Sequence, residues 1–347
     1  MSNFLGNDTV TVWGKIYTRS DAENADSEIE RRFLTREFAN QDAQKAAKQV
    51  LKATGSFRKR GLKVQITLRK GKFKDGSNSI MISDLGMTAT VEKAGPPDFG
   101  KASVSIYGLP ADVMEQLSTL SMMPMFYNFN YINIFAGDEI QGYSQIFAGT
   151  IQNATADFNS QPDVKMNINA RVGFWGSVTA QGQNVVSGSQ PVSGFISNQA
   201  KLAGMTFENK GVTSSVQNAI FSGSPVEQAK QAAEQVGAEL VIDDDKMILI
   251  PQGGAIKGNV PVLSAETGLL GYPTMSQNGI EFKAIFNPAF RFAGLIELKT
   301  MVPKCTGQWR IIKLSHKLSS NLPGDGSWES QITAFYPHMS GACGRFI

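Results

Sequence analysis

Residues that could support acid–base or nucleophilic chemistry are scarce in this chain. Its 347 residues include two histidines, His316 and His338, and two cysteines, Cys305 and Cys343. A serine or cysteine nucleophile needs a base and a group that orients the base. Neither a Gly-x-Ser-x-Gly turn nor a reactive cysteine signature is present. The sequence therefore disfavours an enzyme, and two cysteines exclude a disulfide-stapled scaffold.

His316 is the histidine with the clearer setting. It shares the apolar phase of a predicted strand with Ile312, Leu314 and Leu318, whereas lysine and serine occupy the other phase. We expect a buried imidazole that is hydrogen-bonded across a sheet rather than a catalytic base.

Metal and phosphate sites are also not expected. The triplet Asp243–Asp245 lacks the glycine and the glutamate that complete a calcium loop, and the apolar run 247–250 follows at once, which favours a hairpin turn. The segment Gly71–Ser77 lacks the Gly-Lys-Ser/Thr ending of a phosphate loop. We predict no metal and no cofactor.

A basic run between Arg58 and Lys74 contains no acidic residue before Asp75. It permits two interpretations, a contact with phosphates or an acidic partner and a solvated strand face. Aromatic residues do not alternate with the basic ones as in a stacking platform, and the whole chain has a formal net charge of only +3. We expect no specific nucleic-acid binding.

Composition favours a β-rich fold with many turns. Charged residues make up 18% and hydrophobic residues 41%, with 34 glycines, a profile unlike that of disordered or coiled-coil chains. The start shows no secretory signal, and the most apolar stretch, residues 122–135, is interrupted by proline and asparagine. We expect synthesis in the cytoplasm and no membrane insertion.

The elements divide the chain into four parts. Residues 1–60 hold an acidic run, Asp21 to Glu30, and a predicted helix over 41–52, and we interpret them as an extended or helical arm. Residues 61–176 alternate apolar and polar in Leu62–Arg69 and Val164–Val172, which predicts an antiparallel barrel or sandwich. Further predicted elements there are strands over 102–107, 129–135 and 146–151, a helix over 110–120, and turns at 74–78, 95–98 and 136–138.

Residues 177–259 combine a linker with a small α+β domain. Gly173–Gly194 is rich in glycine and serine and predicts a linker, followed by a short helix over 196–203. Ser224 and Pro225 then open a helix that ends at Gly237, before a hairpin over 239–250. Residues 260–347 predict strands over 280–286, 294–299, 308–318 and 329–336. The expected fold is mainly β (α+β), with two β-barrel domains around the small one.

The C-terminal part carries a pattern of spaced glycine, proline, tryptophan, histidine and leucine residues: Gly279, Pro288, Gly294, Trp309, His316, Leu318, Pro323 and Trp328. This pattern resembles the closing barrel of baseplate hub proteins from contractile-tailed bacteriophages, which are similar to type VI secretion spike proteins. Phe147–Ile151 with Gln161–Asp163 looks like their first barrel, and 225–251 looks like their small inserted domain. The resemblance covers about 61–347.

This resemblance implies tail-tube-like barrels and a mechanical role in the virion tail baseplate. Three chains would form a pseudo-sixfold ring between the tail tube protein and the central spike protein, with a lumen for DNA or the tape-measure protein. The arm would contact neighbouring baseplate proteins. Candidate lumen or inter-subunit residues, for which plain outer surface is the alternative, are Lys63, Arg69, Lys165, Asn167, Asn169 and Arg171.

Three other functions stay open on the sequence. A tail-tube initiator or terminator would form hexamers. Such proteins are usually single-barrel chains, so the second predicted barrel disfavours this function. A tail-associated cell-wall hydrolase would bring a domain with a Glu/Asp or Cys/His site. A carbohydrate-binding β-sandwich would expose aromatic residues, whereas most aromatics here fall in buried strand phases.

Overall fold

The computed structural model describes the chain as two compact units, residues 58–265 with 269–347, and residues 1–57 with 266–268. In the latter unit, β1 (Thr9–Val12) and β2 (Lys15–Thr18) form an antiparallel ribbon. The acidic run, the predicted helix over 41–52, His338 and Cys343 lie outside the described residues. The described residues are 9–12, 15–18, 59–95, 99–119, 129–140, 142–159, 164–256, 258–277, 279–323 and 326–336.

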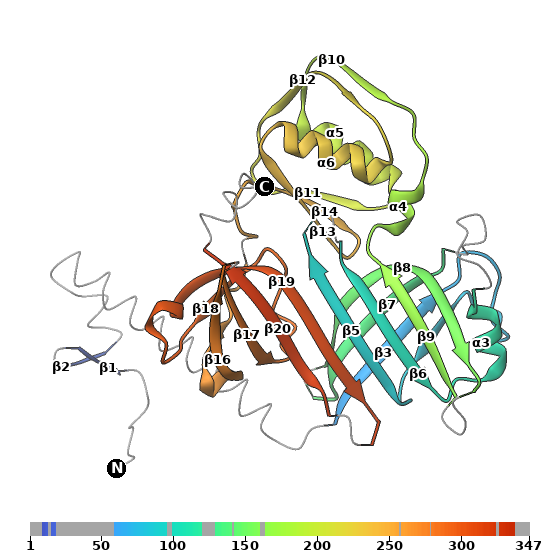
Figure 1. The fold of residues 1–347 in the computed structure, drawn as a ribbon, viewed down its shortest axis with the longest axis horizontal. Helices are drawn as coiled ribbons and strands as arrows, with labels where there is room; N and C mark the ends of the chain where they lie inside the picture. The colour runs from blue at the N-terminus through green and yellow to red at the C-terminus, as the bar shows by residue number, and fades with distance from the viewer. Residues whose placement is uncertain are drawn as a thin grey trace. The chain divides into compact units, whose positions relative to one another are not determined.

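The first β segment is an antiparallel series ordered β5-β6-β9-β8-β7-β3-β4 (Figure 1). The predicted alternation is confirmed: Leu62, Val64 and Ile66 are buried in β3, and the residues between them are half-buried. Helix α3 (Ala111–Leu117) adds Val113, Met114 and Leu117 to the same core. The strands are β3 (Arg60–Thr67), β4 (Ser79–Ile82), β5 (Met87–Ala94), β6 (Lys101–Tyr107), β7 (Tyr131–Asp138), β8 (Gly142–Asp157) and β9 (Lys165–Arg171).

The turn predicted at 136–138 is wrong, because these residues are the last part of β7. Ala136 is fully buried, so this small residue continues the apolar phase of the strand. The chain turns later, before Gly142, whose φ of 84° is a left-handed value that favours glycine.

The inserted domain, residues 174–251, packs helices against a three-stranded sheet ordered β11-β14-β13. The predicted start of α6 is confirmed, since Ser224 Oγ accepts a hydrogen bond from the Glu227 N–H and Glu227 accepts one from the Ser224 N–H. Its elements are α4 (Phe174–Val178), β10 (Asn184–Pro191), α5 (Val192–Leu202), β11 (Thr206–Asn209), β12 (Ser215–Phe221), α6 (Pro225–Gln235), β13 (Ala238–Asp243) and β14 (Lys246–Pro251).

The linker predicted over Gly173–Gly194 is wrong, since it contains α4 and β10. β10 pairs with β12 and buries Val186, while most of its other residues are exposed. Because this strand buries so little, its composition is polar and glycine-rich like that of a loop. That composition explains why the sequence predicted a linker here.

The second β segment confirms the four predicted strands and adds two that were not predicted, β15 and β16. β16 has only two buried positions, so it shows no apolar alternation. The elements are β15 (Val262–Leu263), β16 (Leu269–Ser276), β17 (Gly279–Ile285), β18 (Leu295–Leu298), β19 (Gly307–Ser320), β20 (Trp328–Phe335) and the 3-10 helices Ala265–Thr267 and Pro303–Cys305.

The two β segments share one sheet because β19 pairs with strands of both. On one edge β19 pairs with β20; on the other its first residues pair with β18 and its second half with β5. The pairing with β5 runs from Lys313–Ala94 to Ser320–Met87. The mainly β class is therefore confirmed, with an open series of strand pairings rather than closed rings among the described residues (Figure 1).

Residues of the C-terminal family pattern hold the second segment together. Gly279 has a φ of 112°, and a Cβ there would collide with the Ala334 carbonyl oxygen, so this strand start requires glycine. The buried Trp309 donates its indole N–H to the Cys305 carbonyl at 2.8 Å. Leu318 and Trp328 are also buried, but they pack in the core cluster that contains the first β segment, so they join the two segments.

His316 lies at the joint, on β19 between β5 and β20. As predicted, it is buried and hydrogen-bonded across the sheet, with Nδ1 2.8 Å from Ser330 Oγ. The Phe286 ring packs edge to face against the His316 imidazole, with the two ring centroids 5.1 Å apart. Burial lowers the pKa of His316 to about 3, and the positive charge of Lys93 acts in the same direction. The folded protein therefore holds a neutral imidazole.

This histidine predicts a loss of stability in mild acid. In the unfolded chain His316 is protonated below its ordinary pKa of 6.5, whereas in the folded chain it is protonated only below a pKa of about 3. The free energy of unfolding should fall by up to about 1.4 kcal/mol per pH unit through this range. Urea unfolding at pH 7 and pH 5 measures it. His316→Gln, which still offers Ser330 a partner, should have a smaller pH dependence; an equal dependence would contradict the assignment.

Candidate functional site

Within the eight-strand series β16-β17-β20-β19-β5-β6-β9-β8, a polar face runs from β17 to β8. Directly opposed residues of antiparallel strands project on the same face, so the register can be followed from strand to strand. One row of opposed residues runs across six strands: Glu329, Lys317, Thr90, Ser103, Asn169, Asn153. The next row is Lys283, Gln331, Ser315, Glu92, Lys101, Arg171.

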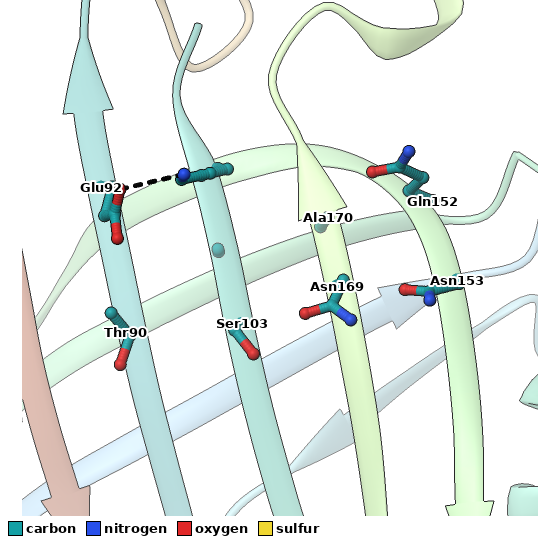
Figure 2. Close-up of a pocket in the computed structure, with 9 residues that line it drawn as sticks. Thr90, Glu92, Ser103, Gln152, Asn153, Asn169 and Ala170 are labelled. Atoms are coloured by element: carbon teal, nitrogen blue, oxygen red, sulfur yellow. Dashed lines mark ion pairs between the residues drawn. The ribbon is translucent and has the colours of Figure 1, made fainter. Parts of the chain in front are cut away.

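The polar face is hollowed where β5, β6, β9 and β8 lie side by side (Figure 2). This groove has a volume of about 320 Å³. Glu92 and Lys101 form an ion pair of 3.2 Å at one side of it, and hydroxyl and amide groups of Thr90, Ser103 and Asn169 form its floor. Such groups can donate and accept hydrogen bonds.

The structure brings four of the six candidate lumen residues together. Lys165, Asn167, Asn169 and Arg171 all project from β9 onto the polar face. The other two lie elsewhere: Lys63 is in β3, at the far side of β7, and Arg69 follows the end of β3, so both are outside the eight-strand series.

Much of the basic run makes contacts within the chain. Arg69 stacks on Trp175 of α4, with its guanidinium carbon 3.6 Å from the ring centre, and Lys63 Nζ lies 4.0 Å from the ring centre of Tyr143. Lys74 pairs with Asp112 at 3.0 Å. These contacts favour the surface interpretation of the run over a strip for nucleic acid.

A buried ion cluster joins the inserted domain to the first β segment. Lys93 Nζ lies 2.6 Å from Asp243 Oδ1 and 3.1 Å from Asp244 Oδ1, and Asp244 Oδ1 also accepts the Ala148 N–H at 3.0 Å. The Lys93 side chain is 12% exposed and each carboxylate is 18% exposed. We call Lys93, Asp243, Asp244 and the Ala148 N–H the clamp.

The geometry of the clamp explains the charges it holds. Burial acts to lower the pKa of Lys93, but the two carboxylates overcome it, and that pKa is raised. Burial raises the pKa of Asp244; Lys93 opposes this and Asp243 adds to it. The predicted hairpin turn is confirmed, and Asp244 lies in it with a φ of 55°.

A second contact fixes the inserted domain to the second β segment. The Arg310 side chain, 3% exposed, pairs with Glu239 of β13 at 2.6 Å. Beside it Val241, Ile248 and Ile250 pack in one apolar cluster with residues of the loop before β18, Phe292 and Ala293. The inserted domain therefore contacts both β segments, through Lys93 of β5 and Arg310 of β19.

Sequence reasoning missed the clamp. Its partners lie 150 and 151 residues apart, and no local pattern marks Lys93 as a partner of the turn. Within the described parts of the chain, no three His, Cys, Asp or Glu side chains gather into a metal site. The described helices are also too short or too polar to cross a membrane.

The clamp predicts a large effect of removing its single cation. Lys93→Met would leave two carboxylates facing each other in a mostly buried place, which should lower the free energy of unfolding by about 3 kcal/mol. Lys317→Met is the matched control, because Lys317 is exposed on the polar face; it should change stability by less than about 0.5 kcal/mol. Urea unfolding at pH 7 compares the two variants, and equal effects would refute the clamp.

Solved structures with a similar fold include tail proteins and a chain of a PdpA-VgrG complex. The 43 kDa tail protein of prophage MuSo2 from Shewanella oneidensis matches with a TM-score of 0.54 at 9% identity, covering 81% of this chain and 97% of that one. The tail protein from Neisseria meningitidis MC58 matches with a TM-score of 0.55 at 8% identity, covering 81% and 99%. A chain of the Francisella PdpA-VgrG complex gives 0.51 at 7%, covering 83% and 54%.

Sequence comparison identifies the family directly. No curated protein matches this chain. The protein family described as "Baseplate hub gp41", however, matches residues 61–322. Because that match spans well over half of the 347 residues, and the fold is that of phage tail proteins, the chain belongs to the baseplate hub gp41 family of structural tail proteins.

Proposed function

We propose that this protein is the central hub of the baseplate and that three copies close into a pseudo-sixfold ring, without catalytic activity. The observation that carries the proposal is the eight-strand series. The first β segment contributes four strands, β5, β6, β9 and β8, and the second contributes β16, β17, β20 and β19. With one wall segment from each group of four strands, three copies would give six wall segments.

The end strand β16 supports a contact between copies. Among the described residues it pairs with β17 alone. Its side chains Leu270, Tyr272 and Met275 are 40%, 70% and 56% exposed, and an apolar edge strand is a template for pairing with another chain. We place β16 of one copy beside a strand of the next copy.

In this ring the polar face would line the lumen. Its hydroxyl and amide groups and its mixed charges would let DNA or the tape-measure protein pass without being held. Lys165, Asn167, Asn169 and Arg171 would then be lumen residues. The rims would bind the tail tube protein and the central spike protein, and residues 1–60 would contact neighbouring baseplate proteins.

Imaging of purified tails tests the proposal. We expect three copies in one ring between tube and spike, in the tail baseplate of the virion. Six copies in that ring would favour a tube initiator or terminator, and copies along the whole tube would contradict a hub.

The proposed edge contact can be tested separately in assembly. Tyr272→Asp places a charge on β16 and should reduce the yield of assembled baseplates at least tenfold, since a buried unpaired charge costs several kcal/mol. Ile220→Asp is the matched control, because Ile220 is 65% exposed on the inserted domain. Complementation with each variant, followed by counting of complete tails, measures this. Equal yields from the two variants would argue against the β16 contact.

A further inference from the structure

A β-bulge brings two adjacent amide side chains to the groove on the polar face. The register of β8 against β9 shifts between Ile151 and Asn153, so Gln152 is an extra residue without an opposed partner. Successive side chains of a regular strand project to opposite faces, and a bulge re-aims one of them. As a result Gln152 and Asn153, although adjacent in the chain, both line the groove (Figure 2).

The polar side chains of the groove are not engaged elsewhere in the described part of the chain. Asn133 on β7, by contrast, donates a hydrogen bond to Gln65 on the neighbouring strand. The covered Oδ1 of Asn153 has no partner, and the last torsion angle of asparagine has a broad energy profile, so this amide can turn towards a ligand. No hydrogen bond between described residues uses the hydroxyl or amide side-chain groups of Thr90, Ser103, Gln152, Asn153 and Asn169.

The charge and size of the groove narrow the class of ligand. Of the residues that line it, Glu92 and Lys101 are charged, and they pair with each other. Arg171 stands opposite Lys101 but outside the lining. A nucleic-acid track needs several cations and commonly adds stacking aromatic residues, and the lining offers neither. Its volume of about 320 Å³ corresponds to about ten water molecules, which suits a short stretch of an uncharged polar ligand.

We propose that the groove is a binding site for an uncharged, polar stretch of polypeptide, held by hydrogen bonds to the amide groups of Gln152, Asn153 and Asn169. A polypeptide carries N–H donors and carbonyl acceptors at short intervals, and amide and hydroxyl side chains complement both. One neutral hydrogen bond changes an affinity by only about threefold to tenfold. A single groove therefore binds weakly and detains a passing chain only briefly.

This inference rests on the proposed function for its setting and deepens it. Of the two chains that the lumen would admit, DNA and the tape-measure protein, it names a polypeptide as the one that the groove recognises. The groove is built from four strands of a single chain, so its binding can be measured without the ring. Absence of binding would therefore overturn the groove alone, and a wrong number of copies in the tail would overturn the ring alone.

An NMR titration of the full chain tests the proposal. The chain carries nitrogen-15 in its asparagine and glutamine side chains, and the Asn169 signal is identified by its loss in Asn169→Ser. The two probes are a blocked hexapeptide of alternating glutamine and serine and a thymidine oligonucleotide of the same length. We expect the peptide to shift the side-chain amide signal of Asn169 in a saturable way and the oligonucleotide to leave it in place.

Two asparagine variants locate the binding. Asn153→Ala removes one amide from the groove and should weaken the affinity for the peptide at least threefold, as expected for one lost hydrogen bond. Asn133→Ala is the matched control, because it removes a half-buried strand asparagine outside the eight-strand series. This control should keep the wild-type affinity.

Three results would overturn the proposal. They are an Asn169 signal that the peptide does not shift, an equal shift with the oligonucleotide, and an equal loss of affinity in the two alanine variants. The first two comparisons use the wild-type chain, so they decide the question even if Asn153→Ala does not fold.

Discussion

The pairing of β19 with β5 is the constraint on which the rest of this structure depends. β19 is 14 residues long, and eight of them, Lys313 to Ser320, pair with β5, which belongs to the other β segment. Since the register of this pairing is fixed, the polar residues of both segments project on one face. Without it the two segments would be separate sheets, and no continuous polar face would exist.

The inserted domain reinforces this joint from both sides. Its apolar contacts and the Arg310–Glu239 pair attach it to the second β segment, and the clamp attaches it to the first. Lys93 stands directly opposite Leu314 in the pairing of β5 with β19, so the clamp lies on the joint itself. A shift of one segment against the other would therefore have to break a buried ion cluster as well as a strand pairing.

How much of this was predictable from the sequence depends on the range of the interactions. β3 and β9 were predictable because their apolar and polar residues alternate, and the start of α6 because its cap is local in sequence. β5 was not predicted, since its buried positions include the small Ala89 between Met87 and Val91, which weakens the alternation. The joint and the clamp could not be predicted, because their partners are more than a hundred residues apart and nothing local specifies them.

The clamp gives the joint direction rather than stability alone. Replacing a buried ion cluster by apolar residues is often neutral or stabilising, so such a cluster is weak evidence of a need for stability. What this cluster adds is geometry: Asp244 accepts both the Lys93 ammonium and the Ala148 N–H, which fixes the hairpin in direction as well as in distance. An apolar contact, by contrast, tolerates sliding. A joint that must keep one strand register needs the directional contact more than the additional stability, and the chain places that contact where its two β segments meet.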